Sequence, residues 1–190
     1  QLEKASASCS KLEDRREALW FAIVSLDHAV QEGRVSLRPR CDNLAALLAK
    51  QYPGSERAVA LISRLVKSSL ISGDDAVKSL LDIPPESPLY LTARSEAVSY
   101  LYAKFSTSRG ADRDFIALRV AEIGEEVVKL YHALAISGTD ESARDAAERL
   151  SVRARQVADV VLQMTSPDPA RAEAMLALIE STASHHGVIL

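Results

Sequence analysis

The chain has 190 residues, with 23 Lys and Arg against 26 Asp and Glu, a net charge of -3, and 47% hydrophobic residues. This composition is typical of a globular protein and excludes a disordered or fibrous chain. The slightly negative net charge does not favour binding to nucleic acid. The two cysteines are too few for a disulfide framework or a cysteine-ligated zinc site. No apolar run approaches the roughly 20 residues of a membrane-spanning helix.

Helical periodicity fills most of the sequence between its 7 glycines and 7 prolines, so we predict an all-α protein. Ser10 and Glu13 form a capping box that opens a first long helix, which runs to about Gln31. Residues 1–11 are expected to be the end of an upstream coiled coil. Because the chain begins at Gln1 without a Met, we expect a processed fragment from which targeting or anchoring segments have been removed.

Shorter helices are predicted next, each beginning at a residue whose side chain can cap it. Asp42 is expected to cap a short helix that stops at Tyr52, because the proline after it disfavours helix there. Ser55 is expected to cap the following helix. Gly73 is a natural residue just beyond the end of that helix, and Asp74 can cap another short one.

A proline-rich connection separates these helices from the longer ones that follow. Residues 83–92 contain three prolines and are expected to be ordered and extended, with Thr92 capping a helix that runs to about Phe105. The stretch 106–112 is expected to be the loosest loop of the chain.

Two long helices with matching apolar patterns are predicted after this loop. Their apolar residues alternate spacings of four and three, which indicates the contact line of an antiparallel hairpin, and a short turn at 137–140 joins them. We therefore expect Leu130, Leu150 and Val157 to be buried against each other. The two lines consist of Ile116, Val120, Ile123, Val127, Leu130 and Leu134, and of Ala143, Ala147, Leu150, Ala154, Val157, Val161 and Met164.

A terminal helix completes the predicted fold. It begins at Asp168, has Pro169 at its first position and ends near Gly187. We therefore predict a single domain over 1–190, which is a helical bundle with a C-terminal antiparallel helical hairpin plus this terminal helix.

Residues that could carry catalysis or hold a metal are scattered. No histidine has a glutamate three residues before it, and the sequence contains no nucleophile-elbow, phosphate-loop, dinucleotide or zinc-protease motif. Glu125 and Glu126 point in different directions on one helix and are expected to face solvent, so they are not a facing acid and base. The sequence therefore favours a protein that is not an enzyme and that has no metal or cofactor. The histidines are expected to pack within helices or to lie at a helix end: His28, His132, His185 and His186.

Basic and apolar residues lie together on two of the predicted helices, which suits either packing against the protein's own core or contact with an anionic membrane. On the second of these helices, Phe105 would enter the acyl boundary while Lys104 meets lipid phosphates, with Arg94 and Tyr102 nearby. The first of these helices is the alternative place for such a contact, and its basic residues are Arg57, Arg64 and Lys67.

The terminal helix is the expected docking element for a protein partner. Met175, Leu178 and Ile179 give it more apolar width than one contact line requires. Flexible Met side chains also suit an adaptable interface. We therefore expect these three residues to form the partner interface.

Three groups of residues, taken in chain order, form one pattern. The first group is a tryptophan-bearing helix that contains Leu19-Trp20 with Ile23 and Leu26. The second group consists of a short segment at 81–87, with the sequence Leu-Asp-Ile-Pro-Pro-Glu-Ser, together with Lys104-Phe105 on an amphipathic helix. The third group lies across the hairpin and near the chain end: Gly138, Glu141, Ala143, Leu150, Arg155, Val157, Ala158, Leu162, Leu178-Ile179 and Ala183-Ser184. Over most of residues 19–184 this pattern resembles the C-terminal domain of the mitofilin family, which organises mitochondrial cristae junctions.

The resemblance implies a non-enzymatic scaffold at the mitochondrial inner membrane, with this domain facing the intermembrane space. It also implies a partner subunit that carries a coiled-coil-helix-coiled-coil-helix module, contact with anionic lipid, and a homo-oligomer formed through upstream regions. The segment 105–115 is too short for the family's arginine-rich stretch, and Lys104 stands where the family has arginine, so the chain would be a divergent or shortened member. The alternative is a generic α-helical hairpin adaptor unrelated to mitochondria.

Overall fold

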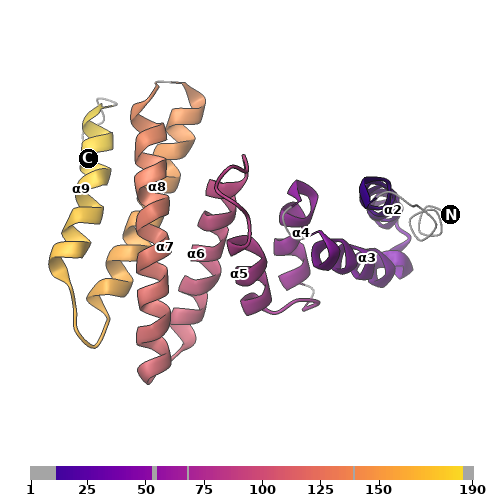
Figure 1. Cartoon of the computed structure of the whole chain (residues 1–190), viewed down its shortest axis with the longest axis horizontal. Coiled ribbons are helices and arrows are strands. Elements are labelled where there is room, and N and C mark those ends of the chain that lie inside the picture. Colours follow the sequence, from indigo (N-terminus) through magenta and orange to yellow (C-terminus); the bar gives the residue numbers. More distant parts are fainter. Residues whose placement is uncertain (1–11, 53–54, 68, 139, 186–190) are drawn as a thin grey trace. The chain divides into compact units, whose positions relative to one another are not determined.

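The computed structural model describes residues 12–52, 55–67, 69–138 and 140–185, and every regular element in this part of the chain is helical (Figure 1). The prediction of an all-α helical bundle is confirmed. The Ser10 cap, the coiled-coil end at 1–11 and the helix end near Gly187 lie outside the described residues. In chain order the elements are α2 (Leu12–Gln31), a short 3-10 turn (Val35–Leu37), α3 (Arg38–Gln51), α4 (Glu56–Lys67), α5 (Gly73–Leu81), α6 (Tyr90–Thr107), α7 (Gly110–Ile136), α8 (Glu141–Leu162) and α9 (Pro169–His185).

The helices divide into two compact units, one within Gln1–Leu89 and the other within Tyr90–Leu190. The single domain over 1–190 stays a prediction. The helices of the first unit bury an apolar core of their own.

That core is built by α2, α3 and α4. Leu19 and Ile23 of α2 join Leu48 of α3 and Ala58 and Leu65 of α4, and all five side chains are buried. α5 extends the unit by packing against α4. These helices therefore bury one apolar face within the unit, while Phe21 and Val24 of α2 and Leu47 of α3 remain exposed.

Local chemistry sets the starts of α3 and α4. Ser55 caps α4 as predicted, because its Oγ accepts a hydrogen bond from the backbone N of Ala58 at 3.2 Å. The predicted Asp42 cap is wrong, since α3 begins at Arg38 and Asp42 lies buried inside the helix. Pro39 occupies the first turn instead, where its missing N–H would have no helical partner in any case.

The helices α5 and α6 both begin earlier than predicted. Ser72, and not Asp74, caps α5 by accepting a hydrogen bond at 3.0 Å from the backbone N three residues later. Gly73 is therefore the first residue of α5 and not the end of α4. α6 begins at Tyr90, so the predicted cap at Thr92 lies inside the helix.

Both predicted connections around α6 also differ from expectation. Residues 83–89 form turns and bends in place of an extended chain. The loop expected at 106–112 is reduced to Ser108 and Arg109 between α6 and α7. Gly110 makes this tight connection possible because it adopts a φ of 61°, a conformation that side chains disfavour.

In the second unit α7 and α8 form the predicted antiparallel hairpin, with α6 and α9 packed beside it (Figure 1). The predicted turn at 137–140 includes position 139, which lies outside the described residues; Asp140 caps α8 by accepting a hydrogen bond at 3.0 Å from the backbone N three residues later. Asp168 caps α9 in the same way at 3.0 Å, and Pro169 is its first residue as predicted. The hairpin plus terminal helix is thus confirmed.

The contact line of α7 is rotated relative to the predicted one. Leu150 and Val157 are fully buried as expected, but Leu130 is 37% exposed and Leu134 is 47% exposed, so this part of the prediction is wrong. Tyr131 takes the core position in place of Leu130. Because one residue turns a helix by about 100°, burying Tyr131 rotates Leu130 away from α8.

Gly124 of α7 lies at a close contact between α7 and α8. A Cβ atom built on this glycine would lie 2.4 Å from Cγ2 of Val157. Such a separation is far below normal van der Waals contact. The absence of a side chain at Gly124 therefore allows α8 to pack where it does.

Candidate functional site

The residues expected at a lipid surface have different environments on α6. Lys104 is exposed, whereas Phe105 is only 1% exposed. Arg113 of α7 covers the Phe105 ring, with its Cζ 4.3 Å from the ring centroid. The prediction that Phe105 enters a membrane is wrong for the folded unit, because the apolar face of α6 packs into the unit's own core.

Tyr102 and Tyr90 hold α6 against the hairpin through their hydroxyl groups. Tyr102 Oη donates to Asp159 Oδ2 of α8 at 2.8 Å, and Tyr90 Oη donates to Glu126 Oε1 of α7 at 2.6 Å. The hydrogen bond to Asp159 raises the pKa of Tyr102, and the one to Glu126 raises the pKa of Tyr90, because each stabilises the protonated hydroxyl. The polar end of Tyr102 is thus engaged within the unit.

Arg94 lies near the start of α6, far from the other basic residue of the expected lipid site. Its Cζ is 4.9 Å from the centroid of the Tyr90 ring. At 1.5 Å per residue, Arg94 and Lys104 are about 15 Å apart along the helix. The structure therefore does not gather Arg94, Tyr102, Lys104 and Phe105 into one site.

The alternative basic residues on α4 are only partly described. Arg57 Nη1 lies 2.5 Å from Glu17 Oε1 of α2, and its Cζ is 5.2 Å from the Trp20 ring centroid. Arg57 therefore links α4 to α2 inside the first unit. The side chains of Arg64 and Lys67 lie outside the described part of the structure.

The residues expected to bind a partner on α9 are also largely engaged. Met175 is 5% exposed and belongs to the core, so the prediction that it forms an adaptable interface is wrong. Leu178 and Ile179 are half-buried. α9 packs against both α8 and α7, which explains why its apolar width is used inside the unit.

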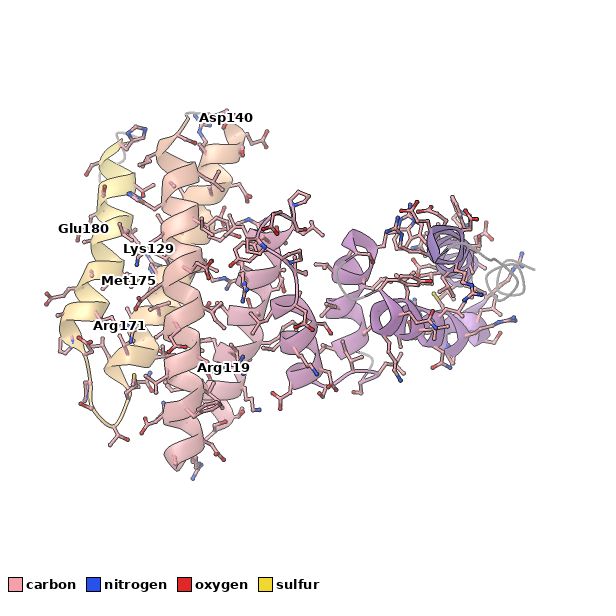
Figure 2. The ribbon with its side chains drawn as sticks, in the orientation of Figure 1. Arg119, Lys129, Asp140, Arg171, Met175 and Glu180 are labelled. Carbon is pink, nitrogen blue, oxygen red and sulfur yellow. The ribbon has the colours of Figure 1, made fainter. Side chains whose placement is uncertain are left out.

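Polar contacts that the sequence did not predict join α7 to α9. Arg171, labelled on α9 in Figure 2, forms an ion pair with Glu125 of α7. Both side chains are largely buried, whereas the sequence predicted a solvent-facing glutamate. His132 Nδ1 lies 2.9 Å from the Oγ1 of Thr182, which is itself buried. These partners are 46 and 50 positions apart in the chain, so no local pattern identifies them.

A second polar cluster joins α6 to α8. Arg153 Nε donates to the Oγ of buried Ser95 at 2.9 Å, and Arg153 Nη1 donates to Gln156 Oε1 at 2.9 Å. Burial of the guanidinium lowers the pKa of Arg153 from its ordinary value. The cluster pairs polar groups that the packing would otherwise leave unsatisfied, which is a structural task.

The described residues also bear on metal binding and membrane crossing. Among residues 12–52, 55–67, 69–138 and 140–185, no three His, Cys, Asp or Glu side chains gather in a way that could hold a metal ion. Within the same ranges, no helix combines the length and the apolar character needed to cross a membrane.

Several large apolar side chains of α7 are exposed, and two of them, Leu130 and Leu134, form the candidate functional site. α7 has 27 residues and α6 has 18. Tyr90, the first residue of α6, donates a hydrogen bond to Glu126 of α7. The residues of α7 that follow Glu126 therefore extend past the start of α6. Leu130 and Leu134 lie in this extension, and we call this pair of leucines the α7 overhang. The large exposed hydrophobic residues of α7 are Phe115, Leu118, Leu130, Leu134 and Ile136.

Comparison with known proteins does not add a relationship. No family model matches the chain, and no similar curated protein or solved structure was found. The resemblance to the mitofilin domain therefore stays a prediction, and the structure supplies the fold and the α7 surface on which function can be argued.

Proposed function

We propose that this chain is a non-enzymatic scaffold that works through protein association, in the manner of a mitofilin domain at mitochondrial cristae junctions. Its proposed location is the mitochondrial inner membrane, with the domain facing the intermembrane space. The observation that carries the proposal is the α7 overhang, where Leu130 and Leu134 are exposed on a helix whose neighbour has ended. The residues shared with the mitofilin pattern support the more specific role.

The overhang suits a helical partner. Leu130 and Leu134 are four residues apart and therefore lie one above the other on the same face of α7. Such a pair matches the anchor spacing used when one helix docks against another. Because the two leucines are only 37% and 47% exposed, covering what remains of each would contribute about 0.6–1.4 kcal/mol, before the cost of association is subtracted. A subunit with a coiled-coil-helix-coiled-coil-helix module offers helices that could cover this pair.

Point variants test this role better than truncation does. Removing residues 168–190 would strip α9, including buried Met175, from the second unit. Leu130→Asp with Leu134→Asp instead changes exposed positions only. The tagged wild-type chain should capture cristae-complex subunits from detergent-solubilised mitochondria, as identified by mass spectrometry, and the double variant should lose them.

Val152→Asp is the matched control, because Val152 is an exposed apolar residue on α8 outside the overhang. It should capture the same subunits as the wild type. Equal recovery by the double variant would show that the overhang is not the docking surface. Capture of other proteins, with no cristae-complex subunit among them, would favour the generic hairpin adaptor.

Contact with an anionic membrane is a second part of the proposal. With Phe105 in the core and Arg94 held over Tyr90, this contact would rest on the exposed Lys104 and would be electrostatic, at about 1 kcal/mol for this residue. Lys104→Asp should reduce co-sedimentation with cardiolipin-containing vesicles without changing the helical circular dichroism. Unchanged sedimentation would remove Lys104 from the proposal. A homo-oligomer through upstream regions is a further expectation from the mitofilin resemblance.

A further inference from the structure

The outward face of α7 carries a second pattern, separate from the overhang. Its exposed residues are separated by three, four, seven, four and three positions, with apolar residues at both ends and charged residues between them. We call this set the outer stripe, and it consists of Phe115, Leu118, Glu122, Lys129, Ala133 and Ile136.

The outer stripe is complementary to itself when the helix direction is reversed. A two-fold axis through the middle of α7, between Glu125 and Glu126, would bring Phe115 opposite Ile136 of a second copy. The same axis would bring Leu118 opposite Ala133 and Glu122 opposite Lys129. We propose that a second copy of this chain docks antiparallel along the outer stripe of α7.

Charge determines the direction of this docking. A parallel arrangement would place Glu122 opposite Glu122 and Lys129 opposite Lys129, whereas the antiparallel one forms an opposite-charge pair at each of these positions. Within the described part of the chain, neither Glu122 nor Lys129 takes part in an ion pair, so both are available to a partner. Facing like charges are a means by which proteins reject a wrong partner or orientation.

Glu125 and Glu126 lie equally close to the axis, and the like charges that the two Glu126 side chains bring there are offset by the nearby lysines. Glu126 is exposed and accepts the hydrogen bond from Tyr90, so a carboxylate from each copy would lie near the axis. Lys129 of the second copy would lie within about one helical turn of it, since Glu126 stands opposite position 125. Each lysine would therefore be flanked by two glutamates, Glu122 and Glu126, of the other copy.

The dimensions also suit a helix pair. From Phe115 to Ile136 the stripe is about 32 Å long at 1.5 Å per residue. Two helices that pack along such a length usually lie 8–10 Å apart at a crossing angle near 20°. This inference does not depend on a mitochondrial role, and it uses none of the overhang residues, so it can succeed or fail independently of the proposed function.

Charge reversal tests the inference directly. The full chain is measured by sedimentation equilibrium over a range of concentrations as wild type, Glu122→Lys, Lys129→Glu and the double reversal. The wild type should dimerise, and each single reversal should raise the dissociation constant about tenfold or more, because like charges then face each other twice. The double reversal should restore dimerisation, since it exchanges the two signs. Glu148→Lys, on an exposed position of α8, should behave as the wild type.

Several results would overturn the inference. A wild type that stays monomeric at every concentration would do so, as would single and double reversals that dimerise equally well. Circular dichroism of each variant should match the wild type, because all the changed positions are exposed. If a single reversal loses helicity, Phe115→Asp provides a second variant at an exposed position, and dimerisation of a folded Phe115→Asp chain at wild-type strength would equally contradict the docking.

Discussion

Replacing Gly124 by alanine tests the close packing against α8 that determines which face of α7 is buried. In an isolated helix this change would stabilise the folded state by about 0.5–1 kcal/mol, because glycine loses more backbone freedom than alanine. In this structure the added methyl group would lie 2.4 Å from Val157 Cγ2. The steric cost and the helical gain therefore oppose each other at one position.

The steric cost should outweigh the helical gain. Val157 is fully buried and β-branched, so it cannot rotate aside cheaply. Overpacking of this kind costs about 1–3 kcal/mol, so Gly124→Ala should lower the free energy of unfolding by roughly 0.5–2 kcal/mol. Val157→Ala should itself cost about 1.6 kcal/mol for its two methyl groups, and more for the cavity left behind. With that space opened, Gly124→Ala should become stabilising by about 0.5–1 kcal/mol.

Urea unfolding followed by circular dichroism can measure this change of sign in the wild type, the two single variants and the double variant. Gly73→Ala at the start of α5 is the control, because a Cβ atom there meets nothing within 4 Å, so the change carries no steric cost and should not lower stability. If Gly124→Ala stabilises the protein in both backgrounds, α7 and α8 do not approach at this point and the orientation of the α7 surface is wrong.

Other contacts in the second unit can be tested in the same way. Leu150→Ala should lower the free energy of unfolding by about 2–5 kcal/mol, whereas Leu130→Ala should change it by about 0.5 kcal/mol or less. Equal effects of the two changes in urea unfolding would contradict the rotated contact line of α7. Asp140→Ala should cost about 0.5–2 kcal/mol through the lost α8 cap, and thermal melting should show Asp140→Asn close to the wild type. Because the pKa of Tyr102 is raised in the folded state, the hydrogen bond of its hydroxyl stabilises the protein fully below pH 10, and this contribution is lost as the pH rises through the folded pKa. The stability of Tyr102→Phe should therefore fall less steeply above pH 10 than that of the wild type. Identical pH profiles would refute this.

Two helix starts could be predicted from the sequence because capping is local chemistry. Ser55 and Asp168 are predicted to start helices, and each accepts a backbone hydrogen bond from three residues later. The prediction failed at Asp74 because Ser72, two residues earlier, is an equally good cap. Where two capping residues are close together, the sequence does not decide which one starts the helix.

The orientation of α7 could not be predicted because the helix is apolar on more than one side. Val127 and Val128 are adjacent and both buried, while Leu130 and Tyr131 are adjacent and only Tyr131 is buried. Periodicity therefore fits two contact lines that differ by one residue. The choice depends on the close approach at Gly124, which is a property of the helix pair.

The candidate site was missed for a related reason. Phe105 and Met175 have the residue types expected of a membrane or partner contact, but neighbouring helices cover both. Leu130 and Leu134 have the residue types expected of a core, but α6 begins beside Glu126 and therefore does not cover these later residues of α7. Exposure at these positions depends on the relative lengths of helices, which is known only once they are assembled.

The central claim is that the α7 overhang binds another protein, and photo-cross-linking in intact cells tests it most directly. A photoreactive side chain is placed at position 134 of the full-length protein, with position 152 on α8 as the exposed control. We predict a discrete adduct with a partner protein from position 134, and not from position 152. No adduct at position 134, or the same adducts from both positions, would contradict the claim.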